Sequence, residues 1–257
     1  MSIPQTTHQR PPRVIHEDDS ILAIDKPAGM LVHRGWGKDD EVLVDWVKEY
    51  TQAEKVHPIH RLDRATSGVV LFAQNPTAAR NLNKLFEQRQ IQKHYIALVR
   101  GIAPEIGYLD HPVPTEPKGK ERVPAQSSFR RLASNRTTQP RECSLVEVAP
   151  HSGRVHQIRR HMAHLNHPLI GDANYGKGKI NRAFKEHYNL PGLALHAVSL
   201  RFEHPDTQEL IRISTPVDEF LAASLVTMGF EPSAWHTLEQ PDYEPDWLEI
   251  AQTFPKT

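Results

Sequence analysis

The densest group of polar side chains is HRLDRATSG at residues 60 to 68, which runs directly into the apolar segment Val69 to Ala73. Asp63 stands between two arginines, and nearby positive charge favours the ionised form of a carboxylic acid. Because the same charges weaken its affinity for a proton, the carboxyl group should be ionised at neutral pH and a poor proton acceptor, which suits a nucleophile or a stabiliser of positive charge. The alternative is an ordinary polar turn in which Asp63, Thr66 and Ser67 hydrogen-bond the local backbone.

A second polar group is SGRVHQIRRH at residues 152 to 161, which continues to His164 and His167. It places four histidines within twelve residues, and His161 and His164 have the spacing of one helix face. Zinc sites usually include carboxylate or thiolate ligands, however, and the only nearby acid is Asp172. We therefore favour a basic, hydrogen-bonding helix that faces phosphate over a metal site, and a metal hydrolase stays the minor alternative.

Tyr95 stands at the entrance of an apolar run, KHYIALVRG at residues 93 to 101. A tyrosine there can stack on a base, exchange a proton or fill the core with its hydroxyl at the edge. Taken alone, the residue favours core filling. The segment DKPAGMLVH at residues 25 to 33 is typical of a turn after a strand.

These groups must be positioned by alternating strands and helices. Runs rich in β-branched residues predict strands at 21–24, 69–73, 95–99, 144–148, 195–202 and 210–214. Apolar residues at helical spacing predict helices at 77–90, with Thr77 as a possible cap, at 156–166 and at 217–228. Strands interleaved with few helices predict a mixed α/β (α+β) domain with a substantial antiparallel sheet.

The chain divides into three parts by composition. Residues 1–12 are polar, contain three prolines and predict a loose leader, while residues 13–230 form one domain without a linker. Residues 231–257 form a proline-containing acidic tail in which Trp235, Tyr243 and Trp247 are possible packing anchors.

The net charge of zero, from 31 Lys and Arg against 31 Asp and Glu, is an average over unlike segments. Residues 154–201 hold eight basic and two acidic residues, for +6, and residues 118–136, which look like a basic loop, carry +5. Residues 231–257 carry −5. The basic residues in the middle of the chain predict a polyanionic partner, and deletion of the acidic tail should strengthen non-specific binding to that partner.

Two further features concern the compartment. A single cysteine, Cys143, excludes an intramolecular disulfide and favours a reducing compartment. The first thirty residues have no uninterrupted apolar segment of the signal-peptide type, and no stretch is typical of a membrane span. We expect a cytoplasmic, monomeric protein.

In this order, the four segments at 25–33, 60–68, 93–101 and 153–172 resemble the RluA-type RNA pseudouridine synthases, as does Leu195-His196-Ala197. The resemblance spans about residues 14 to 228, and HRLD followed by TSG is a specific signature. It implies the pseudouridine synthase fold, with a large, mainly antiparallel central sheet flanked by helices and loops. It also implies an isomerase that converts uridine to pseudouridine in RNA, without cofactor or metal.

The resemblance assigns roles residue by residue. It makes Asp63 the essential aspartate, either a nucleophile or the group that removes a sugar proton, and makes Arg61 the residue inserted into the stack that a flipped uridine vacates. Tyr95 would pack on the target base, and Arg159 would pair with the carboxylate. Further RNA contacts are expected from these residues: His60, Arg64, Arg154, Gln157 and Arg160.

The segments at 31–41 and 171–197 are similar to the branch of this family that modifies uridine 65 in the T stem of tRNA. Tyr175 and the tail beyond Phe230 depart from that branch. The alternatives are a synthase acting on 23S ribosomal RNA and, from another class, a catalytically silent RNA-binding protein. We expect tRNA as the partner.

Overall fold

The computed structural model describes residues 10–34, 42–116 and 119–254. Its strands are β1 Arg13–Glu17, β2 Ile21–Lys26, β3 His57–Pro58, β4 Ser67–Ala73, β5 Gln92–Arg100, β6 Ile106–Asp110, β7 Val113–Pro114, β8 Arg122–Val123, β9 Gln126–Asn135, β10 Cys143–Pro150, β11 Leu195–Glu203 and β12 Leu210–Ser214. Its helices are α1 Leu43–Thr51, α2 Pro76–Glu87, α3 Gln157–His164, α4 Gly178–Tyr188, α5 Glu219–Thr227, α6 Ser233–Glu239 and α7 Trp247–Thr253.

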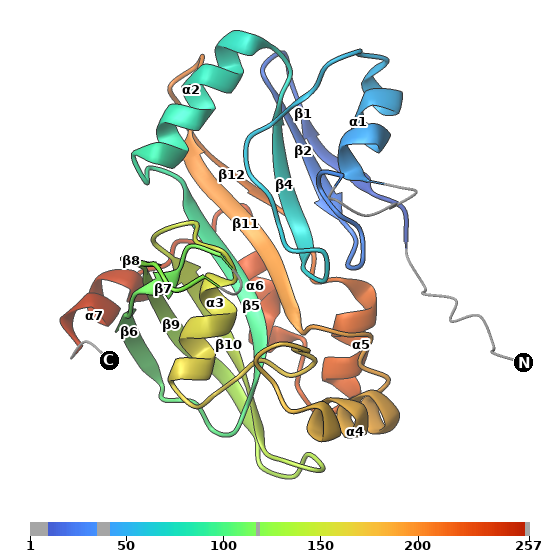
Figure 1. Cartoon of the computed structure of the whole chain (residues 1–257), viewed down its shortest axis with the longest axis vertical. Coiled ribbons are helices and arrows are strands. Elements are labelled where there is room, and N and C mark those ends of the chain that lie inside the picture. The colour runs from blue at the N-terminus through green and yellow to red at the C-terminus, as the bar shows by residue number, and fades with distance from the viewer. Residues whose placement is uncertain (1–9, 35–41, 117–118, 255–257) are drawn as a thin grey trace, which may run out of the picture.

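One ten-stranded sheet organises the molecule, in the order β1-β2-β4-β11-β5-β10-β9-β6, with β12 paired to β11 and β3 to β4. All of these pairs are antiparallel except β4 with β11, so the predicted mixed fold with a mainly antiparallel sheet is confirmed. In Figure 1 the sheet runs the length of the molecule, with α1 and α2 at one end and α4 and α5 at the other.

The parallel pair explains why glycine follows the polar loop. Gly68 has a φ of 114°, and a Cβ there would lie 2.1 Å from the carbonyl oxygen of Ala197. Ser67, the neighbouring residue, shares a contact of 2.9 Å between its Oγ and Nδ1 of His196. The TSG segment and the Leu195-His196-Ala197 segment therefore meet edge to edge, and only glycine permits this approach.

Apolar packing on the sheet builds four large clusters and a small one. The largest joins β5, β10 and β11 to α4, α5 and α6, and another packs α2 against β2 and β4. Helix α3 covers β5 and β10 through Ile158 and Met162, while α1 packs on β2 and β4. Burial of these faces supplies the main stabilisation of the elements that carry the polar loops.

The six predicted strands and three predicted helices are confirmed, each within a few residues of its bounds. The interpretation of residues 118–136 as a basic loop is wrong over 126–135, which form β9. The arginines of this segment suggested a solvent-exposed loop, but their guanidinium groups bond other parts of the protein. Arg130 bonds Glu147, and Arg131 bonds the carbonyl of Ala103. The helix cap is also Asn75 rather than Thr77, since the Asn75 side chain accepts from the Ala78 amide.

The tail is anchored as predicted by its aromatic residues. Trp235, Tyr243 and Trp247 are all buried. The hydroxyl of Tyr243 donates to Glu147 at 2.9 Å and accepts from Nε1 of Trp247 at 3.1 Å. Helices α6 and α7 therefore pack on the same sheet as the rest of the chain (Figure 1).

Most of the predicted leader lies outside the described residues. Arg10 is described, and its guanidinium pairs with Asp25 at 2.6 Å and with Asp218 at 3.2 Å. The chain is thus fixed to the sheet edge from residue 10 onward. None of the helices within the described ranges is long and apolar enough to cross a membrane.

Candidate active site

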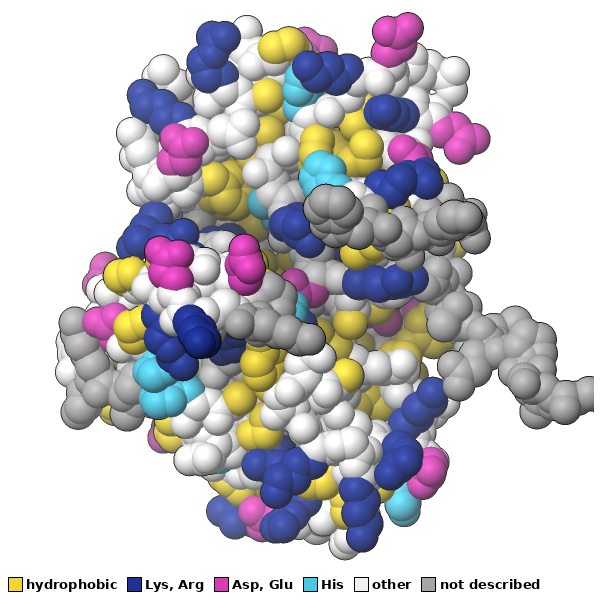
Figure 2. Space-filling view, viewed as in Figure 1, with side chains coloured by type: hydrophobic (Ala, Val, Ile, Leu, Met, Phe, Trp, Pro, Cys, Tyr) yellow, Lys and Arg dark blue, Asp and Glu magenta, His cyan; other side chains and the backbone are white. Residues whose placement is uncertain are grey.

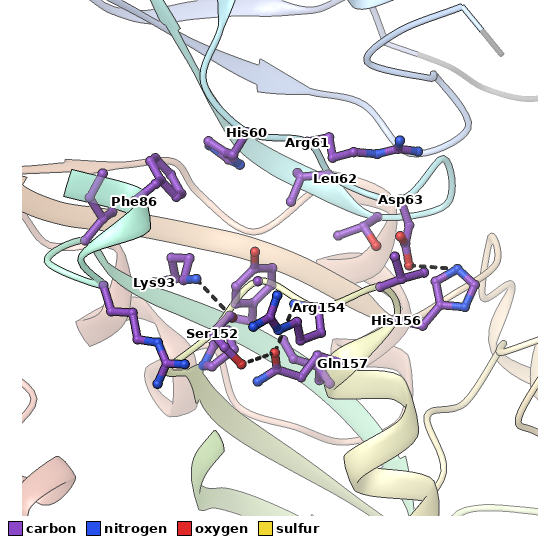
Figure 3. A pocket seen from close by; sticks show the side chains of 18 of the residues that line it. His60, Arg61, Leu62, Asp63, Phe86, Lys93, Ser152, Arg154, His156 and Gln157 are labelled. Atoms are coloured by element: carbon purple, nitrogen blue, oxygen red, sulfur yellow. Dashed lines mark hydrogen bonds and ion pairs between the residues drawn. The ribbon is translucent and has the colours of Figure 1, made fainter. Parts of the chain in front are cut away.

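A cavity of about 750 Å³ opens between the loop before β4, the start of β5 and the N-terminal end of α3. Seven of the nine residues predicted to act or to bind substrate line it: His60, Arg61, Asp63, Tyr95, Arg154, Gln157 and Arg159. Figure 3 shows Asp63 and Arg154 on opposite sides of this space, on the loop before β4 and the loop before α3. Three segments far apart in sequence therefore converge on one hollow.

Asp63 lies at the tip of a loop whose two ends are fixed. On one side Leu62 is buried, and on the other the Thr66 amide donates to the Asp63 carbonyl at 3.0 Å. The loop is also tied to the 27–30 turn, because Arg64 and Gly29 exchange hydrogen bonds. A backbone turn is thus present, but its side chains are used elsewhere than the predicted alternative had it: Arg159 bonds the Asp63 carboxylate, and Ser67 contacts His196.

Arg159 holds the carboxylate from below. Its Nη1 donates to Oδ2 of Asp63 at 2.9 Å, and its Nε and Nη2 donate to the two carboxylate oxygens of Asp172 at 2.7 and 2.8 Å. Burial lowers the pKa of Arg159, but the bonds and charges of Asp172 and Asp63 outweigh it and raise that pKa overall. The predicted pair between Arg159 and Asp63 is therefore present. The fully buried carboxylate of Asp172 holds the other side of the Arg159 guanidinium.

His156 is a site residue for which the sequence reasoning assigned no role. Its Nε2 lies 3.7 Å from Oδ2 of Asp63, and its Nδ1 lies 3.0 Å from the hydroxyl of Tyr175. That hydroxyl accepts from Nε of Arg160 at 2.7 Å, so its own proton is available to Nδ1 of His156. This arrangement favours the tautomer with the proton on Nε2, facing Asp63.

Both partners approach the same oxygen of Asp63. Arg159 and His156 face Oδ2, and Oδ1 accepts no hydrogen bond within the described part of the chain. The Asp63 side chain is 28% exposed, whereas that of Asp172 is fully buried. One carboxylate oxygen is thus held by the protein while the other is left for a molecule in the cavity.

Tyr95 forms a wall of the cavity from the central strand β5. In the sheet it pairs with Ala197 of β11, which in turn pairs with Gly68 of β4, so two small residues separate the tyrosine from the Asp63 loop. Burial, helped by the charge of Asp63, raises the pKa of the Tyr95 hydroxyl. The hydroxyl is therefore protonated at neutral pH, beside an aromatic face that a base could stack on.

The far wall is built on backbone contacts. Lys93 donates to the Ser152 carbonyl at 3.0 Å, and burial, followed by the charge of Arg89, lowers the pKa of this lysine to about 8. Gln157 is saturated: its Oε1 accepts from Ser152 and from the Arg154 amide, and its Nε2 donates to Gln126 and Ser127. Gln157 therefore shapes the 152–154 loop, and the exposed side chain of Arg154 is left for substrate (Figure 3).

Three of the predicted RNA contacts carry protein contacts of their own. Arg64 and Arg160 are not among the residues that line the cavity, and Arg160 donates to the carbonyls of Pro114 and Glu116. His60 lines the cavity, but its Nε2 accepts from the Leu71 amide and its ring stacks on Phe86. Burial lowers the pKa of His60 to about 3, so its ring is neutral and holds the start of the loop.

The histidines of the second polar group separate in space. His161 contacts Ser127 and the His111 carbonyl, His164 stacks on His111, and His167 contacts the Arg100 carbonyl. Among the residues that the structure describes, no three His, Cys, Asp or Glu side chains are grouped as a metal ion would require. The helix is a hydrogen-bonding element, and His156 alone of the four faces the cavity.

The site has the features of an enzyme active site. An oriented carboxylate, a neutral tyrosine and several cations surround a cavity the size of a small ligand. The comparisons agree. Residues 20–164 match the family model described as RNA pseudouridylate synthase, and the chain belongs to this family. It is an RNA pseudouridine synthase, an isomerase.

Two relatives are similar over most of their length. Proteins named tRNA pseudouridine synthase C are 37% identical in Vibrio cholerae, over 86% of this chain and 97% of the relative, and 39% identical in Haemophilus ducreyi, over 87% and 96%. Among solved structures, Human RNA Pseudouridylate Synthase Domain Containing 4 is 25% identical, with a TM-score of 0.69 over 85% of this chain and 93% of that chain.

Proposed function

We propose that this enzyme isomerises uridine 65 of tRNA and that Asp63 is its catalytic residue. In the reaction the bond between C1′ of the ribose and N1 of uracil breaks, and a bond between C1′ and C5 forms. N1 gains a proton and the C5 proton leaves, so no oxidant, reductant or cofactor is consumed. What the enzyme must provide is a group acting at the sugar or base, a proton acceptor and a grip on the turning base.

The observation that carries this proposal is the one-sided hold on Asp63. A carboxylate bonded at Oδ2 by Arg159, with His156 3.7 Å from the same oxygen, on a residue that lines a cavity, suits attack on an electrophilic carbon or removal of a sugar proton. The Tyr95 ring supplies the surface on which the base would rest during its rotation.

The target nucleotide must leave its helix to enter the cavity. Figure 3 shows the Arg61 side chain extending along the loop beside Asp63, and Arg61 is exposed. A cation there can occupy the gap that an extruded base leaves and contact the neighbouring phosphates. Together with Arg154 on the opposite rim, it supports entry of a flipped uridine.

The relatives named tRNA pseudouridine synthase C support tRNA as the substrate, and position 65 rests on the sequence resemblance. A tRNA substrate supports action in the cytoplasm, and we keep a monomer as the expected state. Part of one segment that suggested this branch, residues 35–41 with their acidic side chains, lies outside the described residues.

The decisive experiment measures tritium release from tRNA labelled at C5 of uridine. Asp63→Asn should abolish release while tRNA binding is retained, because the substitution keeps the shape of the side chain and removes its charge. Asp242→Asn, which changes an exposed acid of the tail, is the matched control and should keep full activity. Full activity of Asp63→Asn would refute its role.

Mapping pseudouridine in a strain that lacks the enzyme tests the target. Loss of the modification at tRNA position 65 alone is expected. Loss at a site in large-subunit ribosomal RNA with intact tRNA would instead favour the ribosomal alternative. An unchanged pattern in both RNAs would favour a binding protein without catalysis.

A further inference from the structure

A group of exposed cations lies away from the cavity, at the end of the molecule formed by α4. The α4 surface consists of Lys177, Lys179, Arg182 and Lys185, with Arg141 of the loop after β9. That loop contacts α4 directly, since the Gln139 amide donates to the hydroxyl of Tyr188. Figure 2 shows dark blue side chains gathered at this lower end, below the basic residues that border the cavity.

The cations of the α4 surface stand in a row with little acid among them. Lys179, Arg182 and Lys185 recur every three residues, so they share one side of the helix over about 9 Å. Within the described ranges none of the five forms an ion pair, and Glu186 is the acid exposed on this helix. By contrast, Arg136 of the same loop pairs with Glu142.

Such a row is most often a solvated helix face, and two observations argue for more here. The whole chain carries no net charge, so five cations beside two acids, Glu186 and the Glu142 that Arg136 pairs with, represent a local segregation of charge. The predicted basic segment 154–201 also divides in space: Arg159 and Arg160 are buried and Arg154 lies at the cavity rim, while four exposed cations lie on α4 or directly before it.

The helix is fixed to the site by a side chain on its inner face. Asn181 donates to the Asp172 carbonyl at 2.8 Å and accepts from the Gly171 amide at 3.1 Å. The carboxylate of Asp172 holds Arg159, which in turn bonds Asp63. The α4 surface and the cavity are therefore held at a constant separation, as two contacts on one rigid ligand require.

We propose that the α4 surface binds the phosphate backbone of an RNA helix that extends beyond the target nucleotide. The inference rests on the proposed function, since the cavity must first receive a uridine of that RNA. Duplex phosphates are closely spaced, and a straight row of long cationic side chains can contact several of them without reading sequence. The surface would then select structured RNA over a short hairpin.

The test compares two RNAs and two variants. The RNAs are a full-length tRNA transcript and a hairpin that contains only its T stem and loop. The variants are Arg182→Gln/Lys185→Gln on α4 and, as the matched control, Lys48→Gln/Lys55→Gln, which removes two cations at the end of the molecule near α1. The readouts are Kd at several salt concentrations, and kcat and KM from tritium release.

The α4 variant should bind full-length tRNA five- to tenfold more weakly, with unchanged kcat and a salt slope shallower by nearly 2, at about 0.9 per lost phosphate contact. Its affinity for the hairpin should change by less than twofold, as should both affinities of the control. Wild-type affinity and slope for tRNA, or equal losses on both RNAs, would overturn the proposal. Absence of conversion by the wild type would refute the tRNA assignment, and the binding comparison would still decide the role of α4.

Discussion

His156 and Asp63 face each other across 3.7 Å, and the backbone of the histidine is bent to make this possible. His156 adopts a left-handed conformation with a φ of 53°, directly before α3. A non-glycine residue in that region carries roughly 1 kcal/mol or more of strain, which must be held by its contacts. The Tyr175 hydroxyl at Nδ1 is one such contact, and Asp63 is the other.

The first prediction concerns Tyr175. Tyr175→Phe should lower kcat by about three- to tenfold, because His156 loses the partner that sets its tautomer while the ring between Arg159 and Arg160 remains. KM should stay the same. The pH profile of kcat should also change, since removal of the hydroxyl alters the titration of His156, whose pKa burial lowers.

Tyr50→Phe is the control for Tyr175→Phe, because it removes an exposed tyrosine hydroxyl that contacts Glu17 at the far edge of the sheet. It should leave both kcat and the pH profile unaltered. An unchanged kcat and pH profile in Tyr175→Phe would mean that His156 needs no partner beyond Asp63.

The second prediction concerns Asp172, which holds Arg159 in place. Asp172→Asn should reduce kcat by about tenfold or more, because an amide can accept from Arg159 at only one atom and offers no charge to balance it. Arg159 would then keep one of its two bonds to residue 172 and be drawn toward Asp63, which would shift from its position. Single-turnover rates with saturating enzyme separate this loss from weaker binding. Wild-type rates would show that Arg159 is positioned by other contacts.

The third prediction concerns stability at low pH. Burial lowers the pKa of His196 to about 4, so in the folded state the ring stays neutral while the unfolded chain takes up a proton below about 6.5. The stabilisation is complete above pH 6.5 and is lost as the pH falls toward 4. The free energy of unfolding should drop by roughly 2 kcal/mol from this histidine between pH 7.5 and pH 5.

Urea unfolding at the two pH values measures that drop. His161, whose pKa burial lowers to about 4, acts in the same direction, so the wild type should lose more than one histidine's share. His196→Gln cannot titrate and should show a smaller difference between the two pH values. An equal difference in wild type and variant would assign the pH dependence elsewhere.

The fourth prediction tests the effect of the acidic tail on RNA binding by substitutions, because deletion of the tail would disturb the core. Removing residues 231–257 would strip Trp235 and Tyr243 from the core, and Trp235→Ala alone should cost about 3 to 5 kcal/mol. Neutralising three exposed acids by Glu231→Gln, Asp242→Asn and Glu249→Gln leaves the packing intact. This triple variant should bind non-specific RNA more tightly and with a steeper salt dependence than the wild type. Identical salt slopes would mean that the tail does not repel RNA.

Strands and helices with strong apolar patterns could be predicted from the sequence, and so could the loop that carries Asp63. Strand β9 could not, because an arginine that neutralises a buried acid looks the same in sequence as one that faces solvent. Helix α4 was also missed, although Ile180, Phe184 and Tyr188 pack inward at four-residue spacing, because most of the residues between them are polar or charged.

The same ambiguity limited how much of the site could be predicted from the sequence. Arg159 and Arg160 are adjacent residues of the same type, yet Arg159 bonds Asp63 and Arg160 bonds the Pro114 carbonyl. Only the structure shows which arginine has which partner. Asp172 stood thirteen residues from Arg159 and was noted only as an acid near the histidines. His156 depends on a left-handed backbone that no side-chain pattern indicates.

The position of β11 in the sheet has a consequence for synthesis. Strand β11 lies between β4 and β5, although the chain makes it about a hundred residues after them. In a nascent chain that ends before Leu195, β4 can pair with β2 and Tyr95 with Val148 of β10, but no strand joins the Asp63 loop to Tyr95. Such long-range pairing folds slowly. We therefore expect the two halves of the site to come together only after β11 has been made.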